Sequence, residues 1–422
     1  MAARTFYVET LGCPKNQVDS EKLVGTLLAD GMAPADSAEG ADLVVVNTCA
    51  FIEEARQESI DVVLDLADRK GDDARLVVTG CMAERYGDEL AEALPEADTV
   101  AGFGVPVTLG RKVDAAGFDL LRLPRPAPSA PWAYVKVAEG CDKKCGFCAI
   151  PSFRGPQRSR DLPELLDEVD GLAAAGVREI VLVAQDLASF GRDQGKGKRR
   201  LVPLVAEVAD RVDRVRLLYL YPSHLDDELI AAILATGVPY FDLSLQHVAA
   251  PLVRRMRRWG DGAKYLERIE AIRRATPEAA FRSNFIVGYP GETESHHDEL
   301  LAFVQEAQLD WCGFFSYSRE DGTYAADLSD AVPAPLVAER LAELRSLQDE
   351  ITARKRDELV GDVVEVLVDE PGVARSHREA PEIDGVIAVP EHIAVGELHQ
   401  VRITSAAGPD CTAEPLAVSA GV

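Results

Sequence analysis

The sequence contains no long hydrophobic run. Hydrophobic residues make up 47% of its 422 positions, yet no apolar stretch reaches the roughly 18 residues that a membrane-spanning helix needs. The first residues, MAARTFYVET, include too few apolar side chains for a signal peptide. We therefore expect a cytoplasmic protein that makes no contact with a membrane. Its length predicts about two to four domains.

Positive charge is scarce. The chain has 45 Lys and Arg residues against 71 Asp and Glu residues, which gives a formal net charge of −26. A dedicated nucleic-acid binder usually shows a basic face, so this balance argues against broad electrostatic binding to nucleic acid. It indicates either a basic partner or high solubility alone, and composition does not choose between them.

A disulfide framework is not expected, because thiols stay reduced in the cytosol. The eight cysteines of the chain are better explained as metal ligands or catalytic groups.

Prolines divide the chain near its first third. Residues 123–131 read LPRPAPSAP, and this density of proline excludes a helix and favours an extended, semi-rigid linker. The linker separates an N-terminal domain at 1–122 from a central domain at 132–356. A C-terminal domain at 357–422 follows, where the helical pattern is lost.

The N-terminal domain alternates short strands with helices, which is typical of a doubly wound parallel sheet. We expect its strands at 5–9, 43–47 and 75–79 and its helices near 17–29, 51–67 and 83–93. The same alternation occurs six times in the central domain. We expect strands there at 133–139, 179–185, 215–221, 240–246, 282–289 and 312–318, and helices that include 162–176, 262–276 and 334–358.

Six such units predict a partial (β/α)6 barrel, whose active site lies at the carboxyl ends of the strands. The C-terminal domain shows the β-like runs VVEVLVDE, GVIAVP and HQVRIT, which predict a small β-barrel. The whole chain is therefore expected to be an α/β protein with three domains.

Three cysteines, Cys141, Cys145 and Cys148, lie in a tight loop directly after the first expected barrel strand. Thiolates at this spacing suit an iron–sulfur cluster or zinc. A zinc site would need a fourth Cys or His, and the next one along the chain is His224. Zinc completed by a distant residue remains an alternative. Three ligands on a four-iron cluster would leave one iron open.

Another three cysteines, Cys13, Cys49 and Cys81, each follow an apolar strand of the N-terminal domain. The carboxyl ends of parallel strands share one edge of the sheet, so these three are expected to converge. The alternative is that they are buried bystanders. Cys312 and Cys411 fit neither set: we expect Cys312 in the core and Cys411 on the surface.

The segment CDKKCGFC (141–148) resembles the CxxxCxxC motif of the radical S-adenosylmethionine (SAM) superfamily. The resemblance implies that Cys141, Cys145 and Cys148 hold a 4Fe–4S cluster whose open iron binds SAM and cleaves it to a 5′-deoxyadenosyl radical. It also implies that Phe147 lies beside the adenine. Other SAM contacts suggested by the superfamily pattern are Gln185, Asp186, Gln246 and Arg282, with barrel-mouth packing as the alternative for each.

The segments LGCPKNQVDSEK, NTCAFIEEARQESI and TGCMAERY resemble the methylthiotransferase family of radical SAM enzymes. That resemblance implies a second 4Fe–4S cluster on Cys13, Cys49 and Cys81, which holds the sulfur that is donated. One SAM would supply the radical and another the methyl group. An electron donor of the flavodoxin or ferredoxin type is implied as well.

The family includes enzymes that modify tRNA adenosine and a branch that modifies an aspartate β-carbon of ribosomal protein S-twelve. CPKNQVDSE and RSHREAPEIDG (375–385) resemble the protein-modifying branch. Residues 357–422 resemble a TRAM domain, yet they carry 13 acidic residues, three arginines and no lysine. Such a barrel is a poor phosphate binder, so no tRNA is expected. It suits a basic protein, which its field would steer toward the barrel mouth.

Two alternatives to this function stay open, a tRNA adenosine methylthiotransferase and a non-catalytic iron–sulfur redox sensor. The basic runs GKGKRR (195–200) and RRMRR (254–258) are expected to be a solvated loop and a solvated helix face. Contact with ribosomal RNA is the alternative for both runs.

Overall fold

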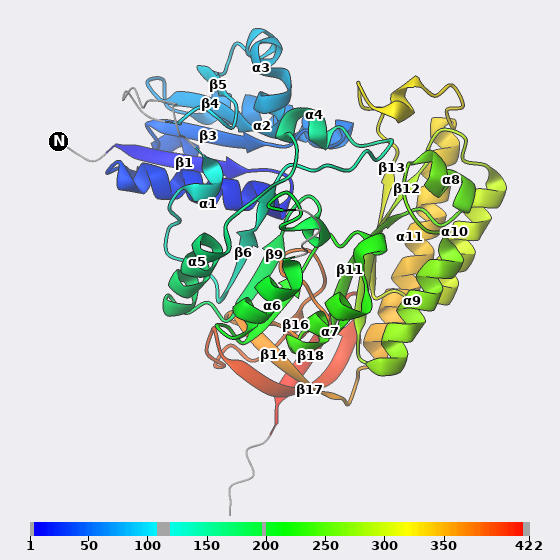
Figure 1. Cartoon of the computed structure of the whole chain (residues 1–422). Helices are drawn as coiled ribbons and strands as arrows, with labels where there is room; N and C mark the ends of the chain where they lie inside the picture. Colours follow the sequence, from blue (N-terminus) through cyan, green and yellow to red (C-terminus); the bar gives the residue numbers. More distant parts are fainter. Residues whose placement is uncertain (1–3, 108–118, 196–199, 417–422) are drawn as a thin grey trace, which may run out of the picture.

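A computed structural model of the chain describes residues 4–107, 119–195 and 200–416 (Figure 1). The N-terminal domain is a parallel five-stranded sheet in the order β2-β1-β3-β4-β5. Its elements are β1 (Thr5–Thr10), α1 (Pro14–Ala29), β2 (Ala33–Pro34), β3 (Leu43–Thr48), α2 (Glu53–Arg69), β4 (Arg75–Gly80), α3 (Cys81–Ala93) and β5 (Thr99–Ala101).

Helix α1 packs on one face of this sheet, and α2 and α3 pack on the other. The expected doubly wound architecture is confirmed. The edge strands β2 and β5 are too short to show in the sequence pattern. Helix α1 begins earlier than expected, at Pro14. Proline is favourable in the first turn of a helix, because the N–H that it lacks would have no hydrogen-bond partner within the helix there.

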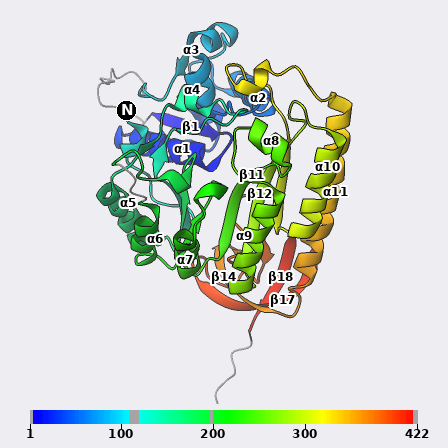
Figure 2. The same ribbon diagram turned by 45° about the vertical axis from the view of Figure 1, so that its right-hand side comes forward.

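The central domain is a partial barrel of six parallel strands (Figures 1 and 2). The strands form two three-stranded sheets, β10-β9-β6 and β11-β12-β13, which the isolated bridge between Leu220 and Leu243 connects. The strands are β6 (Trp132–Lys136), β9 (Glu179–Val183), β10 (Arg214–Leu217), β11 (Tyr240–Gln246), β12 (Ala280–Val287) and β13 (Trp311–Ser316). Around them lie α5 (Leu162–Ala174), α6 (Leu201–Ala209), α7 (Asp227–Ala235), α8 (Ala250–Arg255), α9 (Gly262–Ala275), α10 (Glu294–Ala307) and α11 (Ala334–Asp357).

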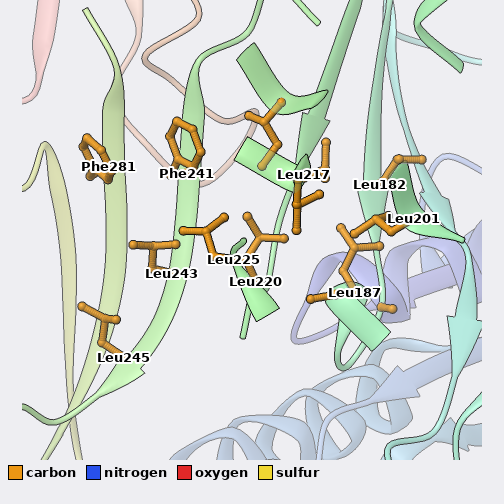
Figure 3. Packing of buried hydrophobic residues seen from close by; sticks show 14 of the residues in the cluster. Leu182, Leu187, Leu201, Leu217, Leu220, Leu225, Phe241, Leu243, Leu245 and Phe281 are labelled. Carbon is orange, nitrogen blue, oxygen red and sulfur yellow. The ribbon is translucent and has the colours of Figure 1, made fainter. Parts of the chain in front are cut away.

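Alternation along these strands separates an outer face, which is apolar, from an inner face. The inner face carries both a second apolar cluster, with Tyr134, Val181 and Tyr240, and buried charged side chains. Residues such as Leu182, Leu217, Phe241 and Phe281 point outward and form the core shared with the helices (Figure 3). The rings of Phe241 and Phe281 stack with their centroids 5.4 Å apart.

Five of the six barrel strands end sooner than the sequence pattern predicts, and two of them, the first and the third, do so by more than two residues. The first stops at Lys136, and the short β7 (Ala138–Glu139) that follows pairs with β8 (Arg158–Ser159). The third stops at Leu217, because Tyr219 adopts a left-handed conformation with a φ of 65°. In both places the strand ends shortly before a residue of the candidate site described below, namely Glu139 after the first strand and Tyr219 after the third.

The C-terminal domain is a closed barrel in the order β14-β15-β16-β18-β17. Its strands are β14 (Val363–Glu370), β15 (Val373–Arg375), β16 (Ile387–Ala388), β17 (Leu398–Ala407) and β18 (Asp410–Pro415). The expectation that Cys411 lies on the surface is wrong. Strand β18 alternates exposed and buried residues, and Cys411 points into the core of the barrel with Val366 and Val401.

The C-terminal barrel covers the amino ends of the central strands, whereas the N-terminal domain covers their carboxyl ends (Figure 1). Residues 375–385 pack into the base of the central barrel. There Arg375 pairs with Glu179 at 3.1 Å, and Asp384 pairs with Arg282 at 3.2 Å. The acidic domain therefore does not border the mouth of the barrel, contrary to the expectation that its field acts there.

Hydrogen bonds join the proline-rich segment to helix α1 and to strand β6. The ammonium of Lys22 donates to the carbonyls of Leu121 and Leu123 at 3.0 and 3.1 Å, and Arg125 donates to the carbonyl of Tyr134 at 2.6 Å. In the described part of the chain, no helix combines the length and the apolar character needed to cross a membrane.

Candidate active site between two cysteine sets

The first set, Cys141, Cys145 and Cys148, lies in the loop between β7 and α4 (Ile150–Arg154). The loop is held from both sides by its backbone, since Gly146 N donates to Met256 O at 2.8 Å and Gly146 O accepts from Ala325 N at 2.7 Å. The ring of Phe147 packs beside Met256 and Ala325. Helix α8 and the segment after β13 thereby fix the position of the cysteines.

Burial raises the pKa of Cys141 to about 11 and the pKa of Cys148 to about 12. The backbone N–H of Lys143, 3.4 Å from the sulfur of Cys141, opposes the rise in the pKa of Cys141. Arg258 Nη1 lies 3.1 Å from the sulfur of Cys145. Because metal binding requires deprotonated sulfur, buried thiols with cationic neighbours suit a bound iron cluster. Arg258 therefore lies in the site, and the expectation that the whole run 254–258 is solvated is wrong.

Side chains with unpaired oxygens lie near this set. Asp186 follows β9, and its Oδ2 accepts from Ser189 at 2.6 Å and lies 3.5 Å from the Lys143 ammonium. Gln185 donates to Glu139 at 3.0 Å. The Oδ1 of Asp186 and the Oε1 of Gln185 are buried with no hydrogen-bond partner among the described residues. Buried acceptors are rarely left unpaired, so these two fit the amino and hydroxyl donors of a ligand such as SAM.

The remaining two residues expected to contact SAM differ in position. Gln246 ends β11 at the carboxyl side of the barrel, with a φ of 73°. Arg282 is the third residue of β12 and lies nearer the base, where it pairs with Asp384 at 3.2 Å and Asp242 at 3.6 Å. The structure does not bring Arg282 together with the cysteines, because its place on the strand is close to the amino end.

The second set lies at the carboxyl edge of the N-terminal sheet. Cys13 follows β1 and precedes α1, Cys49 follows β3, and Cys81 opens α3. Gly12 allows two of them to approach, since a Cβ atom there would lie 2.9 Å from the sulfur of Cys49, and its φ is 94°. Asn16, in the first turn of α1, accepts from the sulfur of Cys81 at 3.4 Å. The structure therefore gathers the three cysteines around the start of α1.

The three thiols of this set differ in their electrostatics. Burial raises the pKa of Cys49 to about 12. Burial acts in the same direction on Cys13, but the cations of Lys15 and Arg154 and the backbone N–H of Asn16 outweigh it and lower the pKa of Cys13. The start of α1 thus favours a thiolate, as expected for a cysteine at a helix N-terminus.

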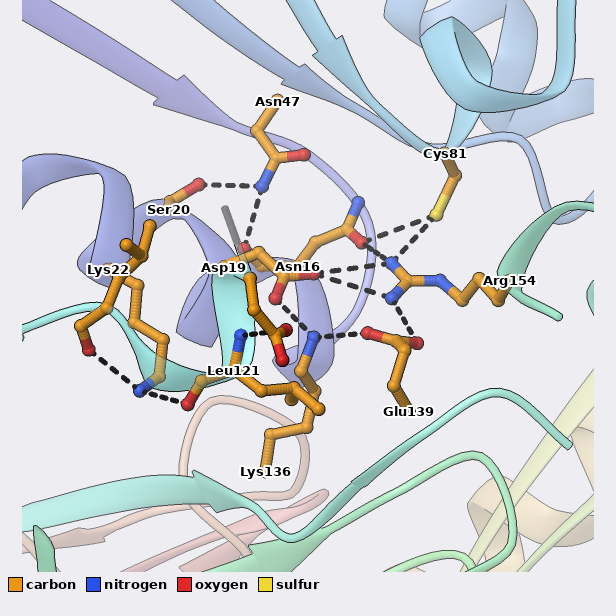
Figure 4. Close-up of polar contacts among 12 residues, drawn as sticks. Asn16, Asp19, Ser20, Lys22, Asn47, Cys81, Leu121, Lys136, Glu139 and Arg154 are labelled. Atoms are coloured by element: carbon orange, nitrogen blue, oxygen red, sulfur yellow. Dashed lines mark hydrogen bonds and ion pairs between the residues drawn. The ribbon is translucent and has the colours of Figure 1, made fainter. Parts of the chain in front are cut away.

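Arg154 connects the loop of the first cysteine set with a cysteine of the second set (Figure 4). It ends α4, just after the first set, and its Nη2 donates to the sulfur of Cys81 at 3.0 Å and to Asn16 Oδ1 at 2.7 Å. Its Nη1 donates to Glu139 at 2.9 Å. Lys136 contacts Asp19 and lies 2.7 Å from Glu139. A buried network of alternating charges therefore connects the barrel strands with the N-terminal domain.

Glu320, in the central domain, forms a second group of contacts with the N-terminal domain. This carboxylate follows β13 and accepts from Arg56 at 2.7 Å and from Arg85 at 2.5 Å. Together with the Arg154 network, it holds the second cysteine set over the mouth of the barrel.

Within the described ranges, no three His, Cys, Asp or Glu side chains are placed to bind one metal ion. A multi-iron cluster is larger than one ion and spaces its ligands farther apart. No motif in the sequence pointed to a site role for Arg154 or Tyr219, and Arg258 was noticed only as part of the basic run 254–258. Lys15 and Lys143 were identifiable only by their places beside Cys13 and Cys141. Residues 196–199 of the run GKGKRR lie outside the described residues.

Six parallel strands, with three cysteines in the loop after the first, define a radical SAM enzyme. The radical SAM superfamily profile matches residues 135–304, the uncharacterized protein family UPF0004 matches 5–102, and the TRAM domain matches 360–416. The solved radical SAM methyltransferase TsrM from Kitasatospora setae is similar in fold. Its TM-score is 0.52 at 16% identity, covering 77% of this chain and 74% of that one.

Curated relatives cover the whole chain. The ribosomal protein uS12 methylthiotransferase RimO of Kineococcus radiotolerans is 41% identical over 98% of both chains. RimO of Streptomyces coelicolor is 40% identical, over 98% of this chain and 97% of its own. RimO of Moorella thermoacetica is 43% identical, over 94% of this chain and 96% of its own. The chain belongs to the RimO family of methylthiotransferases, and its cofactors are SAM and 4Fe–4S clusters.

Proposed function

We propose that this protein adds a methylthio group to the β-carbon of an aspartate in ribosomal protein uS12, in the cytoplasm. The observation that carries the proposal is the full-length similarity to RimO proteins, whose names specify uS12. The juxtaposition of two cysteine sets supports the chemistry. We also propose the domain limits 1–122, 132–356 and 357–422, with 123–131 as the linker.

Each cysteine set holds one 4Fe–4S cluster in this proposal. Cys141, Cys145 and Cys148 hold the first, and Cys13, Cys49 and Cys81 hold the second. When bound, the clusters and SAM supply a 5′-deoxyadenosyl radical and the sulfur for transfer. Radical chemistry is needed because the β C–H bond of aspartate is unactivated, so acid–base catalysis does not open it.

The side chains around the clusters bind, orient and exclude water. Gln185 and Asp186 offer their unpaired oxygens to SAM, with Gln246 at the same end of the barrel and Phe147 beside the adenine. Arg258 and Lys143 N stabilise the thiolates of the first set, and Arg154 stabilises Cys81. Arg282 is left out of the proposed SAM site, since it pairs with Asp384 at the base.

A radical SAM enzyme needs an electron donor, and we propose a reduced flavodoxin or ferredoxin. We propose a basic protein and not tRNA as substrate. The surface of the C-terminal barrel supports this choice, because most of its carboxylates are exposed. The exposed ones are Asp357, Glu358, Asp362, Glu365, Glu370, Glu382, Glu391, Glu397, Asp410 and Glu414. A surface of this charge repels phosphates and attracts a Lys- and Arg-rich protein.

The test offers iron-loaded enzyme both uS12 and tRNA, with SAM, a reductant and sulfide. Mass spectrometry should find a methylthio group on an aspartate of uS12 and unmodified adenosine. Modified adenosine with unmodified uS12 would instead establish a tRNA enzyme. If neither substrate is modified while the iron changes oxidation state reversibly, a redox sensor is the better description.

A further inference from the structure

Lys15 is a buried cation without a carboxylate partner. The residue is 9% exposed, and no described Asp or Glu oxygen lies within ion-pair distance of its ammonium. Every other buried Lys or Arg of the described residues has such a partner. These are Lys22, Lys136, Arg154, Arg160, Arg214, Arg216, Arg340, Arg356 and Arg375. The charges of Cys13 and Asp242 offset part of the cost of burying this ammonium. Neither group forms a direct contact with it that would fill the position, so the site has room for a further anion.

The ammonium of Lys15 lies between the second cysteine set and the barrel. Lys15 is in the first turn of α1, two residues after Cys13. Its Nζ lies 3.3 Å from the centroid of the Tyr219 ring, a cation–π contact with a residue of the barrel. Tyr219 is held in turn by its backbone N–H, which donates to Asp242 at 2.8 Å. The N-terminal domain thus supplies the charge, and the barrel fixes its position.

Three anions could bind at this place: the cysteine sulfurs, the carboxylate of SAM, and a carboxylate of the substrate. The charge of Lys15 favours the Cys13 thiolate, but among the described residues no hydrogen bond joins its ammonium to a cysteine sulfur, whereas Arg154 donates to Cys81 at 3.0 Å. The cations beside the first set are Lys143 and Arg258, so SAM has other partners there. The substrate carboxylate remains. It is attached directly to the β-carbon, which must reach both sets during the reaction.

We propose that Lys15 binds the side-chain carboxylate of the target aspartate and so places its β-carbon between the two cysteine sets. The proposal rests on the proposed function, and it identifies the residue that recognises the modified side chain. The ring of Tyr219 supports the ammonium without neutralising it, which leaves the charge available for the substrate.

A double-mutant cycle across the complex tests this contact. The enzyme partners are the wild type and Lys15→Met. The substrate partners are uS12 and uS12 with the target aspartate replaced by asparagine, which keeps the shape and removes the charge. Binding is measured anaerobically on iron-loaded enzyme. Lys15→Met should weaken binding of uS12 about tenfold or more, while binding of the asparagine form changes by less than about twofold.

Lys70→Met is the matched control, because Lys70 lies in the same domain and, among the described residues, its ammonium contacts only the carbonyl of Ala74. It should bind both substrates as the wild type does. Lys15→Arg keeps the charge and should retain more affinity for uS12 than Lys15→Met. Substrate-free SAM cleavage, which is assigned to the first cysteine set, should continue in Lys15→Met. Lys15→Arg, which keeps the charge beside Cys13, should retain the full iron content.

Equal losses of affinity for the two substrates would overturn the proposal, as would loss of half the iron from Lys15→Arg, which would place Lys15 at the cluster. Failure of the proposed function is recognised separately. In that case the wild type itself leaves uS12 unmodified, and the proposal for Lys15 falls with it.

Discussion

Arg154 and Cys81 belong to different domains, yet the guanidinium donates to the sulfur at 3.0 Å. Arg154 follows the first cysteine set by a single short helix, and Cys81 belongs to the second. The contact lies inside a buried network with Asn16, Asp19 and Glu139 (Figure 4). One side chain therefore sets the position of the second cysteine set relative to the loop of the first.

Replacing Arg154 by Met should destabilise the protein. The change leaves Asp19 and Glu139 buried with only Lys136 as a cationic partner. We expect the free energy of unfolding of the metal-free protein to fall by about 3 kcal/mol, at the lower end for a broken buried pair. Urea unfolding measures it. Arg69→Met is the control, since Arg69 pairs with Glu39 on the exposed surface, and this variant should lose little stability. Similar losses in both variants would contradict a special role for Arg154.

The triple variant Cys141→Ala, Cys145→Ala, Cys148→Ala should lose one of two clusters. Reconstituted wild type should carry about eight irons per chain, by the stoichiometry of two cysteine-ligated 4Fe–4S clusters. The variant should keep about half and should cleave no SAM. Iron and sulfide quantitation and detection of 5′-deoxyadenosine are the measurements. Full iron content in the variant would show that this loop holds no cluster.

The triple variant Cys13→Ala, Cys49→Ala, Cys81→Ala should separate the two activities. It should also keep about half of the iron. Because the first set remains intact, reductive cleavage of SAM should continue, while methylthio transfer to uS12 should stop. A folded variant that no longer cleaves SAM would contradict this division between the sets.

Asp384 should make the docking of the C-terminal domain pH-dependent. Burial raises its pKa from 3.8 to about 6, against the opposing effect of Arg282, the hydrogen bond from Tyr240 and the charge of Arg216. Between these values the folded chain holds a proton that the unfolded chain releases. The contribution of this group to stability is therefore present below pH 3.8 and is lost as the pH rises through about 6.

The control for this effect is Asp384→Asn, which cannot titrate. Between about pH 4 and pH 7, the stability of the wild type relative to Asp384→Asn should fall by up to about 3 kcal/mol. Urea unfolding of the two proteins across this range gives the difference. A constant difference would mean that the carboxyl group titrates alike in the folded and unfolded chains.

Charge reversal on the C-terminal barrel should slow the capture of uS12 without changing the chemistry. Glu370, Glu391 and Glu397 are exposed near the same turns, since Gly372 adjoins Glu391 and Val368 N donates to Glu397 O. Asp369 is unsuitable for such a test, because it binds Arg375 at 2.9 Å. This surface is at the opposite end of the barrel from the cysteines, so the effect should be on association alone.

In the triple Lys variant of these residues, the association rate with uS12 should fall at low salt and approach the wild-type rate at high salt, as screening removes the field. The rate of methylthio transfer at saturating uS12 should not change. A matched control reverses Asp68, Asp72 and Asp73, which are exposed on the N-terminal domain. Equal slowing in both variants would indicate that the association rate depends on the net charge of the enzyme and not on the position of the charges.

Local patterns in the sequence were sufficient to predict the three-domain α/β fold, because strand and helix periods are properties of neighbouring residues. The convergence of Cys13, Cys49 and Cys81 followed from a topological rule, since parallel strands share a carboxyl edge. Arg154 was not predicted, because its partners Cys81 and Asn16 are far away in the chain. Arg282 was misplaced toward the mouth for a related reason: its partner Asp384 comes from the next domain.

Residues 375–385, which close the base of the central barrel, have a consequence for the order in which SAM and the protein substrate bind. With the base of the barrel occupied by Arg375, Asp384 and their partners, we expect SAM and the substrate to reach the interior from the carboxyl ends of the strands. SAM is smaller than the ribosomal protein and would bind deeper in the barrel. We therefore expect SAM to bind before the ribosomal protein and to leave after it. If one turnover uses two SAM molecules, as the family resemblance implies, the protein substrate would have to dissociate each time the nucleoside product is exchanged for new SAM.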